Sequence, residues 1–437
     1  MASEKLLIRK SGPLHGTVKV HGAKNAVLPI MAACLLTDEP SIIENVPQVT
    51  DVSLMSEILR HLGVEVAFDG DRVTVTPGRY TGTTAPYELV SRMRASICVL
   101  GPLLARQGAA KVSMPGGCVI GLRPIDLHLK GLQTLGAAFT IEHGYIIGSR
   151  QVLQGAKVHL AGAFGSSVLA TANVMSAAAL AKGTTIIEHA ACEPEVVDLA
   201  NFLSAMGARI EGQGSPVIRI EGVERLRGVR YRIIPDRIES GTWMIATAVV
   251  GGELSLEGAR TEHLGALIDK LSETNVTIEK LNGSLRVRRS PTQPLRAVDV
   301  TTLPFPGFPT DLQAQMMALM AVARGVSVLT ERVYPERFMH IPELNRMGAS
   351  ITREGTSAIV RGVERLSGAE VTAPDLRASA ALIVAGMSAK NQTALGGLEH
   401  LERGYENFER ELVRLGAKIQ RVSEPVVSQS GSESVRE

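Results

Sequence analysis

The chain has 437 residues, which is enough for about two to four domains of ordinary size. Apolar residues make up 45% and charged residues 21%, as is typical of a globular protein with a large core. The net charge of +2 and the low aromatic content, 3%, argue against nucleic acid or an anionic membrane surface as a partner.

The first twenty residues contain no apolar h-region, so we expect no secretory signal. No apolar run reaches the roughly 18 residues of a membrane span. Four cysteines are scattered without CxxC spacing: Cys34, Cys98, Cys118 and Cys192. We therefore expect a cytoplasmic protein with reduced thiols and no membrane partner.

A short phrase recurs along the chain: Leu, two residues, an apolar residue, Gly, and then β-forming residues. Five copies begin at Leu59, Leu132, Leu203, Leu344 and Leu412. Their glycines are separated by 73, 71, 141 and 68 residues, so the long gap predicts a sixth copy. The phrase LSETNVTI fills that gap, with Asn275 in the glycine position. Asn is the next best residue for a left-handed helix end.

Each copy is a helix end that leads into a strand, and a short strand, a polar loop and an amphipathic helix precede it. The chain thus consists of six α/β modules. A break at Tyr231–Gly241 leaves three modules on each side, which predicts two domains with a ligand cleft between them. A first strand, Lys5–Val20, could belong to either half. The polar tail from Ser423 is expected to be disordered.

The segment Met114–His128 is longer and richer in glycine than the corresponding loops of the other modules. Cys118 lies at its centre, near Arg123, and outside any apolar periodicity. A thiol in this position is a candidate reactive group because a neighbouring cation favours the thiolate. In contrast, Cys34 and Cys98 lie within apolar stretches and are expected to pack in the core.

Basic residues recur in loops and at helix starts: Lys24, Arg94, Arg123, Arg237, Arg337, Arg377 and Arg403. Free backbone N–H groups and the helix dipole favour anions at such positions. If these side chains converge, they form a site for phosphate and carboxylate groups. The alternative is that they are solvated surface residues.

Asp311 follows two prolines and a threonine at the entry of a predicted helix. It is either a helix cap, together with Thr310, or a carboxylate base at the cleft. The chain has no Walker loop and no GxGxxG at a βαβ unit, and its histidines lack the spacing of metal ligands. We therefore expect no cofactor and no metal.

Several long segments together closely resemble the UDP-N-acetylglucosamine enolpyruvyl transferases: HGAKNAVLP, PGGCVIGLRPIDLHLKGL, PDRIESGT, FPTDLQAQ, DLRASAALIVAG and RGYENFERELVRLGA. The resemblance covers residues 5–422 in the same order. It implies an inside-out α/β barrel of two domains, each with three βαβαββ units. Domain 1 would span residues 22–235 and carry the Cys118 loop, domain 2 would span 1–21 with 236–422, and 423–437 would form the tail.

The resemblance also implies an activity. The enolpyruvyl group of phosphoenolpyruvate would pass to the 3-hydroxyl of UDP-N-acetylglucosamine through a tetrahedral adduct, with release of phosphate. This is the first committed step of peptidoglycan synthesis. The two small molecules would be the partners of a monomer or weak homo-oligomer, without a cofactor. Cys118 would be the target of the epoxide fosfomycin.

Site residues follow from the same resemblance, position by position. Four residues would be catalytic: Cys118 as acid or covalent carrier, Asp311 as base, and also Lys24 and Arg403. The phosphoenolpyruvate site would contain Lys24, Asn25, Arg123, Arg377 and Arg403. The nucleotide-sugar site would contain Arg94, Arg123, Pro124, Ile125, Asp126, Leu127, Ser167, Val168, Leu169, Asp311 and Val333.

The chemistry agrees with these implied roles. Phosphoenolpyruvate carries a phosphate and a carboxylate, so its site needs several cations. Addition of an alcohol to its double bond needs a proton for C3 and a base for the hydroxyl. Asp311 can serve as that base if burial raises its basicity, and Cys118 can serve as the acid. Domain closure, with the Cys118 loop as a lid, would exclude water.

One departure from the family pattern concerns the acceptor. The usual Ser-Val-Gly-Ala-Thr is Ser-Val-Leu-Ala-Thr here, so Leu169 adds bulk where the family has glycine. This change keeps open another uridine nucleotide, such as UMP, as the acceptor. A non-catalytic sugar-nucleotide-binding paralogue is a further alternative, but a binder has no need of both an acid and a base. Cys98, where an aromatic residue is common, fits a repacked core.

Overall fold

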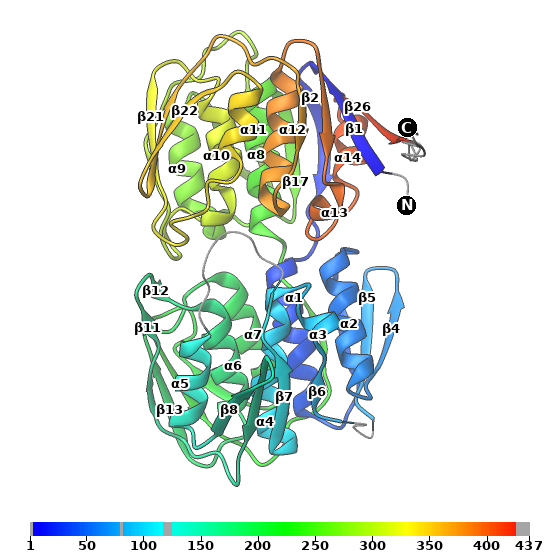
Figure 1. Ribbon diagram of the computed structural model, residues 1–437, viewed down its shortest axis with the longest axis vertical. Helices are drawn as coiled ribbons and strands as arrows, with labels where there is room; N and C mark the ends of the chain where they lie inside the picture. Colours follow the sequence, from blue (N-terminus) through cyan, green and yellow to red (C-terminus); the bar gives the residue numbers. More distant parts are fainter. Residues whose placement is uncertain (1–2, 79–81, 117–124, 425–437) are drawn as a thin grey trace, which may run out of the picture.

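The computed structural model describes residues 3–78, 82–116 and 125–424. Two lobes lie one above the other in Figure 1. The hydrophobic core of the first lobe is formed by residues between Ala23 and Ile234, and that of the second by residues 6–20 together with 238–417. The two crossings between the lobes run side by side, since Gly22 pairs with Pro235 and the Asp236 N–H donates to the His21 carbonyl at 2.8 Å.

In the described part of the chain, six four-stranded sheets form the outer walls of the lobes, and all six follow one pattern. A short outer strand pairs in parallel with a central strand, which pairs antiparallel with a third strand, and a fourth strand lies at the other edge. The sheets of the first lobe are β16 (Arg230–Arg232), β3 (Ser41–Glu44), β5 (Arg72–Thr76), β4 (Glu65–Asp69); β6 (Thr84–Ala85), β7 (Ala109–Ser113), β9 (Tyr145–Ser149), β8 (Ala138–Glu142); and β10 (Lys157–His159), β13 (Thr184–Glu188), β15 (Val217–Glu221), β14 (Arg209–Glu211). A small hairpin joins β11 (Ala161–Gly162) and β12 (Gly165–Ser166).

The sheets of the second lobe repeat this order. They are β2 (Leu14–Lys19), β17 (Gly252–Glu257), β19 (Ser284–Arg289), β18 (Thr277–Leu281); β20 (Val300–Thr301), β21 (Val326–Thr330), β23 (Ser357–Arg361), β22 (Ser350–Glu354); and β24 (Glu370–Thr372), β25 (Gln392–Gly396), β1 (Ser3–Arg9), β26 (Lys418–Glu424). The expected single strand Lys5–Val20 is therefore wrong. The segment forms two strands, and both pair within sheets of the second lobe.

The inner helices explain why the barrel is inside out. Each module places one helix in the centre of its lobe, and most of its residues are buried on every face. These helices are α1 (Lys24–Ala33), α4 (Leu100–Gln107), α6 (Val168–Ala178), α8 (Arg237–Val250), α10 (Gln313–Met320) and α12 (Leu376–Ser388). The sheets cover them from outside, which confirms the predicted fold of βαβαββ units.

A second helix of each module follows the central strand. These helices are α2 (Thr50–His61), α5 (Asp126–Thr134), α7 (Pro194–Ala205), α9 (Gly265–Glu273), α11 (Ile341–Arg346) and α14 (Phe408–Arg414). The short helical turns are α3 (Tyr87–Val90), α13 (Leu398–Leu401), η1 (Cys34–Leu36), η2 (Arg94–Val99), η3 (Thr261–His263) and η4 (Thr310–Leu312). Among the described residues, no helix is long and apolar enough to cross a membrane.

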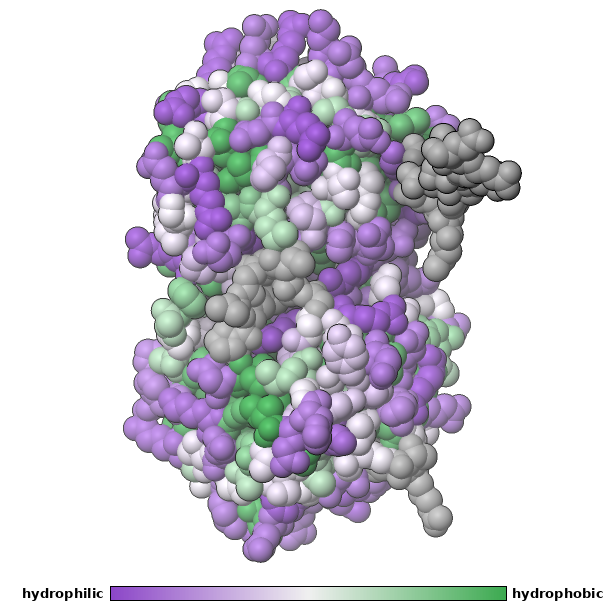
Figure 2. All heavy atoms as spheres, in the orientation of Figure 1, coloured by the Kyte–Doolittle hydropathy of each residue, from purple (hydrophilic) through white to green (hydrophobic). Residues whose placement is uncertain are grey.

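The six repeated helix ends have the backbone that the sequence predicts. The five glycines have positive φ angles, for example 89° at Gly63 and 109° at Gly416. Asn275 has φ 72°, so it forms the same left-handed helix end in the copy without glycine, which is the fourth module in chain order. Cys34 and Cys98 are buried in the first core, as expected. On the face shown in Figure 2, hydrophilic side chains cover most of both lobes.

Candidate active site

A cavity of about 700 Å³ lies between the two lobes. The first lobe contributes the start of α1, the first turns of α2 and α6, and the segment before η2. The second lobe contributes the loop before α10, the segment after β21, the start of α12 and the loop after α13. Helix starts from both lobes thus face one space, where their N–H groups favour anions.

Asp311 lies in η4 and is bound through both carboxylate oxygens. Arg337 Nη1 lies 2.7 Å from Oδ1, and Arg377 Nη2 lies 3.0 Å from Oδ2. Asn25 Nδ2, from the first lobe, donates to Oδ2 at 3.4 Å. The alternative interpretation of Asp311 as a helix cap is wrong, because Pro309 and Leu312 occupy the cap positions of η4 and α10 and the Asp311 carboxylate is bound by Arg337, Arg377 and Asn25 instead. Asp311 instead joins two arginines and an amide across the cavity.

The protonation of Asp311 follows from these partners. Burial raises its pKa, but the charges and hydrogen bonds of Arg377 and Arg337 lower it more. The resulting pKa lies well below the usual range of an aspartate. Our expectation that burial makes this carboxylate more basic is therefore wrong. The two guanidinium groups outweigh desolvation because each bonds directly to a carboxylate oxygen.

A second buried carboxylate, Asp51, holds two of the predicted cations. Lys24 Nζ lies 2.6 Å from Asp51 Oδ2, and Arg403 Nε lies 2.9 Å from Oδ1. Asp51 is 1% exposed. Burial raises its pKa, but Lys24 and Arg403 lower the pKa by a larger amount, so the resulting pKa lies below that of an ordinary aspartate. Lys24 belongs to the first lobe and Arg403 to the second. Asp51 thus connects the lobes at the cavity wall.

Sequence reasoning missed Asp51, and the reason is clear from its position. It lies in the first turn of α2, where an acidic residue ordinarily stabilises the helix dipole. No motif distinguishes it from such a residue. What distinguishes Asp51 is its ion pair with Arg403, which is 352 residues away in the chain and is therefore visible only in the folded structure.

Glu193 and Glu195 were also missed. Glu195 binds Arg237 across the lobes, with Oε1 and Oε2 at 2.9 and 3.3 Å from the guanidinium nitrogens. Glu193 Oε1 accepts the Phe305 N–H at 3.3 Å, while its Oε2 has no hydrogen-bond partner among the described residues. Burial raises the pKa of Glu193. Both carboxylates line the cavity near the loop that leads to Asp311.

Glu331, a further residue without a sequence signal, shapes the second-lobe wall. It is fully buried at the end of β21. Its Oε1 accepts the backbone N–H groups of Val333 and Tyr334 at 2.8 and 2.9 Å. Its Oε2 accepts the hydroxyl of Thr310 at 2.9 Å. This carboxylate therefore fixes both the residue before Asp311 and the predicted pocket residue Val333.

The predicted site residues divide into three groups. The cavity is lined by Lys24, Asn25, Arg94, Val168, Leu169, Asp311, Val333, Arg377 and Arg403. Among the described residues, four lie outside its lining: Ile125, Asp126, Leu127 and Ser167. Of these, Ile125 is buried, and Ser167 caps α6 by accepting the Ala170 N–H at 3.3 Å. Cys118, Arg123 and Pro124 lie outside the described residues.

Comparison with known proteins places this chain and its fold in one class. The family described as EPSP synthase (3-phosphoshikimate 1-carboxyvinyltransferase) matches residues 8–412, and the chain belongs to this family. Within the family, the chain is 51% identical over 417 residues to UDP-N-acetylglucosamine 1-carboxyvinyltransferase 1 of Caldanaerobacter subterraneus subsp. tengcongensis, covering 95% of this chain and 99% of the relative. It is also 51% identical over 433 residues to UDP-N-acetylglucosamine 1-carboxyvinyltransferase of Rhodospirillum centenum, covering 96% and 99%.

Solved structures agree with this assignment. The enolpyruvyl transferase NikO from Streptomyces tendae superposes with a TM-score of 0.87 at 26% identity, covering 97% of this chain and all of that one. An EPSP synthase from Acinetobacter baumannii has a TM-score of 0.72 at 17% identity, covering 96% of this chain and all of the other. The second likeness concerns the fold alone.

Proposed function

We propose that the protein transfers the enolpyruvyl group of phosphoenolpyruvate to the 3-hydroxyl of UDP-N-acetylglucosamine and releases phosphate. This reaction is the first committed step of peptidoglycan synthesis. The named activity of relatives that are 51% identical over nearly the whole chain supports the acceptor and the transferred carboxyvinyl group. The observation in the structure that carries the proposal is the cavity with Asp311 between two arginines and with Lys24 and Arg403 gathered on Asp51.

The cations suit a donor that carries two anionic groups. Lys24, Arg377 and Arg403 line one cavity, although each is paired with a carboxylate there. A phosphate and a carboxylate entering this space would share these cations with Asp51 and Asp311. Asn25, itself a predicted donor-site residue, donates to Asp311 Oδ2 and so links the donor site to the proposed base. This arrangement favours binding of the donor across both lobes.

Asp311 would accept the proton of the acceptor hydroxyl while the oxygen bonds to C2 of the donor. While Arg337 and Arg377 bind both of its oxygens, its low pKa makes it a poor base. When the donor's anionic groups take part of the charge of Arg377 and Arg337, the pKa of Asp311 rises. The base thus gains strength only when the donor is in place. C3 receives a proton in the same addition, and the adduct then loses phosphate and a C3 proton.

Cys118 is our proposed acid or covalent carrier, and Arg123 our proposed phosphate ligand. Both lie outside the described residues, so their roles rest on the family resemblance. The division into domains at residues 22 and 235 is likewise a proposal, supported by the two separate hydrophobic cores. A cytoplasmic monomer or weak homo-oligomer remains our expectation.

The deciding experiment measures phosphate release from phosphoenolpyruvate with UDP-N-acetylglucosamine or UMP as the acceptor. We expect release with the sugar nucleotide and none with UMP. Release with UMP alone would overturn the proposed acceptor and favour the alternative that Leu169 keeps open. Release with neither acceptor would overturn the transferase activity and favour the non-catalytic paralogue.

A further inference from the structure

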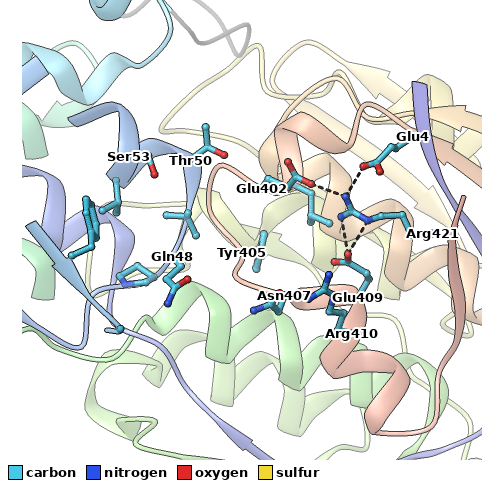
Figure 3. A pocket seen from close by; sticks show the side chains of 16 residues that line it. Glu4, Gln48, Thr50, Ser53, Glu402, Tyr405, Asn407, Glu409, Arg410 and Arg421 are labelled. Atoms are coloured by element: carbon cyan, nitrogen blue, oxygen red, sulfur yellow. Dashed lines mark hydrogen bonds and ion pairs between the residues drawn. The ribbon is translucent and has the colours of Figure 1, made fainter. Parts of the chain in front are cut away.

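Tyr405, in the loop after α13, lies beside the buried charges of the candidate active site. It is 4% exposed and lines a second cavity, of about 770 Å³. Figure 3 shows it on the loop that also carries Glu402 and Asn407. Tyr405 is not among the described residues that line the active-site cavity. It can therefore act on a substrate there only through other side chains.

The Tyr405 hydroxyl is hydrogen-bonded on two sides, and the chemistry of its partners fixes the direction of each bond. Thr242 Oγ1, on α8, donates its own proton to the Ile238 carbonyl at 2.8 Å, so it accepts the proton of Tyr405 at 2.9 Å. Gln315 Nε2, on α10, donates to the Tyr405 oxygen at 3.2 Å. The hydroxyl thus donates one bond and accepts another within the core of the second lobe.

The Gln315 amide connects this hydroxyl to the proposed base. Its Nε2 also donates to the main-chain carbonyl of Asp311 at 3.1 Å. A carbonyl only accepts hydrogen bonds, so the nitrogen of the amide, and not its oxygen, faces Asp311. The Gln315 oxygen has no hydrogen-bond partner among the described residues, so the bonds of the nitrogen alone hold the amide. The main chain at Asp311 therefore depends on a group that Tyr405 holds.

The ring of Tyr405 supports one of the two arginines that bind the base. The guanidinium carbon of Arg377, on α12, lies 5.4 Å from the centre of the ring, within the range of a cation–π contact. Arg377 Nη2 donates to Asp311 Oδ2 at 3.0 Å. Phe408 packs against the same ring, with the ring centres 5.0 Å apart. The ring thus has a fixed position from which it contacts the guanidinium.

The main chain links Tyr405 to the second carboxylate of the site. Arg403, two residues earlier, binds Asp51 of the first lobe, with Nε 2.9 Å from Oδ1. The Tyr405 N–H donates to the Leu401 carbonyl at 3.1 Å, which closes this part of the loop into a turn. A shift of Tyr405 would therefore move Arg403 as well as Arg377. One buried tyrosine connects two of the arginines that are predicted to bind the donor.

We propose that Tyr405 is a positioning residue for donor binding, which holds Arg377 and Arg403 in one arrangement so that both guanidinium groups can meet the anionic groups of the donor together. The donor then does not have to order these side chains on binding, a cost that would weaken its affinity. The inference rests on the proposed function for the identity of the donor. The restraint of Arg377 itself can be measured without any substrate.

This restraint is the first measurement, by NMR of the full chain with isotope-labelled arginine and without substrates. The guanidinium signal of Arg377 is assigned by its loss in Arg377→Lys. In Tyr405→Phe, which keeps the ring and removes the hydroxyl, we expect the guanidinium protons of Arg377 to exchange with water several-fold faster. Thr242→Val removes the acceptor of the hydroxyl proton and should act in the same direction, whereas Thr242→Ser should keep the slow exchange. Unchanged exchange in both Tyr405→Phe and Thr242→Val would overturn the proposal.

Tyr231→Phe is the matched control. The hydroxyl of Tyr231 donates to Asp198 Oδ1 at 2.6 Å, so this variant also removes a hydrogen bond from a tyrosine, but Tyr231 lines neither cavity. Melting temperatures show how far each variant is destabilised. We expect Tyr231→Phe to leave the exchange of the Arg377 protons unchanged. An equal acceleration in Tyr231→Phe and Tyr405→Phe would assign the effect to lost stability and overturn the proposal.

The second measurement is the steady-state rate of phosphate release with UDP-N-acetylglucosamine as the acceptor. In Tyr405→Phe we expect the KM for phosphoenolpyruvate to rise several-fold. The KM for the nucleotide sugar should stay unchanged, because most of its predicted contacts lie in the first lobe. Thr242→Ser should have the KM values of the parent protein. Equal rises of both KM values in Tyr405→Phe would indicate a general structural defect and overturn the positioning role.

The two measurements separate this inference from the proposed function. A parent protein without turnover, but with faster exchange of the Arg377 protons in Tyr405→Phe, would refute the proposed reaction and leave the restraint by Tyr405 standing. Normal turnover, with exchange and KM values unchanged in Tyr405→Phe, would overturn the positioning role and leave the reaction standing.

Discussion

At the scale of single residues, the partners of a carboxylate decide its chemistry. Asp311 is partly buried, which by itself favours the protonated acid. Arg337 and Arg377 bind its two oxygens and reverse that preference. The folded state therefore holds Asp311 ionised, and its ion pairs with the two arginines stabilise the fold. This stabilisation is fully present above the ordinary aspartate pKa of about 4 and is lost as the pH falls through the lower pKa of the folded state.

Removing one of these arginines should shift the pH dependence of the reaction. In Arg337→Gln, we expect the pKa of Asp311 to rise, because Arg377 alone remains to oppose desolvation. The acid limb of the kcat/KM profile for phosphate release should move to higher pH. Arg332→Gln is the control, since Arg332 is exposed and close in the sequence. An acid limb that stays in place in Arg337→Gln would contradict the role of Asp311 as the base.

Substitution of Leu169 tests whether its side chain restricts the space for the acceptor nucleotide. Its side chain is half-buried at the start of α6 and lines the cavity. Leu169→Gly should tighten UDP-N-acetylglucosamine if the leucine restricts the approach of the nucleotide, although glycine costs the helix about 1 kcal/mol. Leu169→Ala separates the two effects, because alanine removes bulk and keeps helix propensity. Calorimetry with the nucleotide sugar is the measurement. Unchanged affinity in both variants would show that Leu169 does not restrict the acceptor.

At the scale of elements, each module depends on a left-handed residue between its outer helix and the following strand. Five modules use glycine, and the fourth uses Asn275 at φ 72°. The Asn275 side chain also donates to the Pro294 carbonyl at 2.9 Å. Asn thus supplies both the backbone conformation and a contact that glycine cannot make.

Substitution of Asn275 should show the cost of this conformation. Asn275→Ala should destabilise the protein by roughly 1–2 kcal/mol or somewhat more, because alanine is strained at this backbone angle and the hydrogen bond is lost. Asn275→Gly loses only the hydrogen bond and should destabilise less. Denaturant unfolding gives both values. Asn282→Ala is the control, at an exposed turn without a positive φ. Equal loss in the alanine and glycine variants would contradict the argument from strain.

At the scale of the whole molecule, a small set of contacts holds the lobes together. His21 lies at one crossing, with Nδ1 2.9 Å from Glu239 Oε1 and Nε2 3.8 Å from Glu406 Oε2. Glu406 in turn accepts the Gln48 N–H from the first lobe. Burial lowers the pKa of His21, but the hydrogen bond and charge of Glu239, with Glu406, raise it to about 9. His21 is therefore protonated at neutral pH.

The stabilisation from His21 should disappear in alkaline solution. A folded pKa of about 9 exceeds the ordinary value of 6.5, so the contribution is complete below pH 6.5 and is lost as the pH rises through 9. Unfolding measurements between pH 6 and 10 should show a steeper decline for the parent protein than for His21→Gln. His15→Gln, at an exposed position of β2, should behave like the parent. Identical pH slopes in the parent and His21→Gln would refute this account.

The sequence by itself determined the modular plan. Apolar periodicity and left-handed helix ends are local properties, so they revealed six α/β modules and the copy that contains Asn275. The same local reasoning identified Lys24, Asp311, Arg377 and Arg403 as candidates, because cations and carboxylates at helix starts are visible in the sequence. It mistook Lys5–Val20 for one strand, since strand pairing with distant modules decides where that segment divides.

Only the tertiary structure decided which charges meet. Asp51 binds Lys24 and Arg403, and Asp311 binds Arg337 and Arg377, through contacts between residues far apart in the chain or in different lobes. The Asp51–Arg403 pair depends on how the two lobes face each other, and the other three pairs depend on how distant segments of one lobe fold together, which no local pattern encodes. They also determine the pKa of each carboxylate, because a nearby cation lowers the pKa whereas burial raises it.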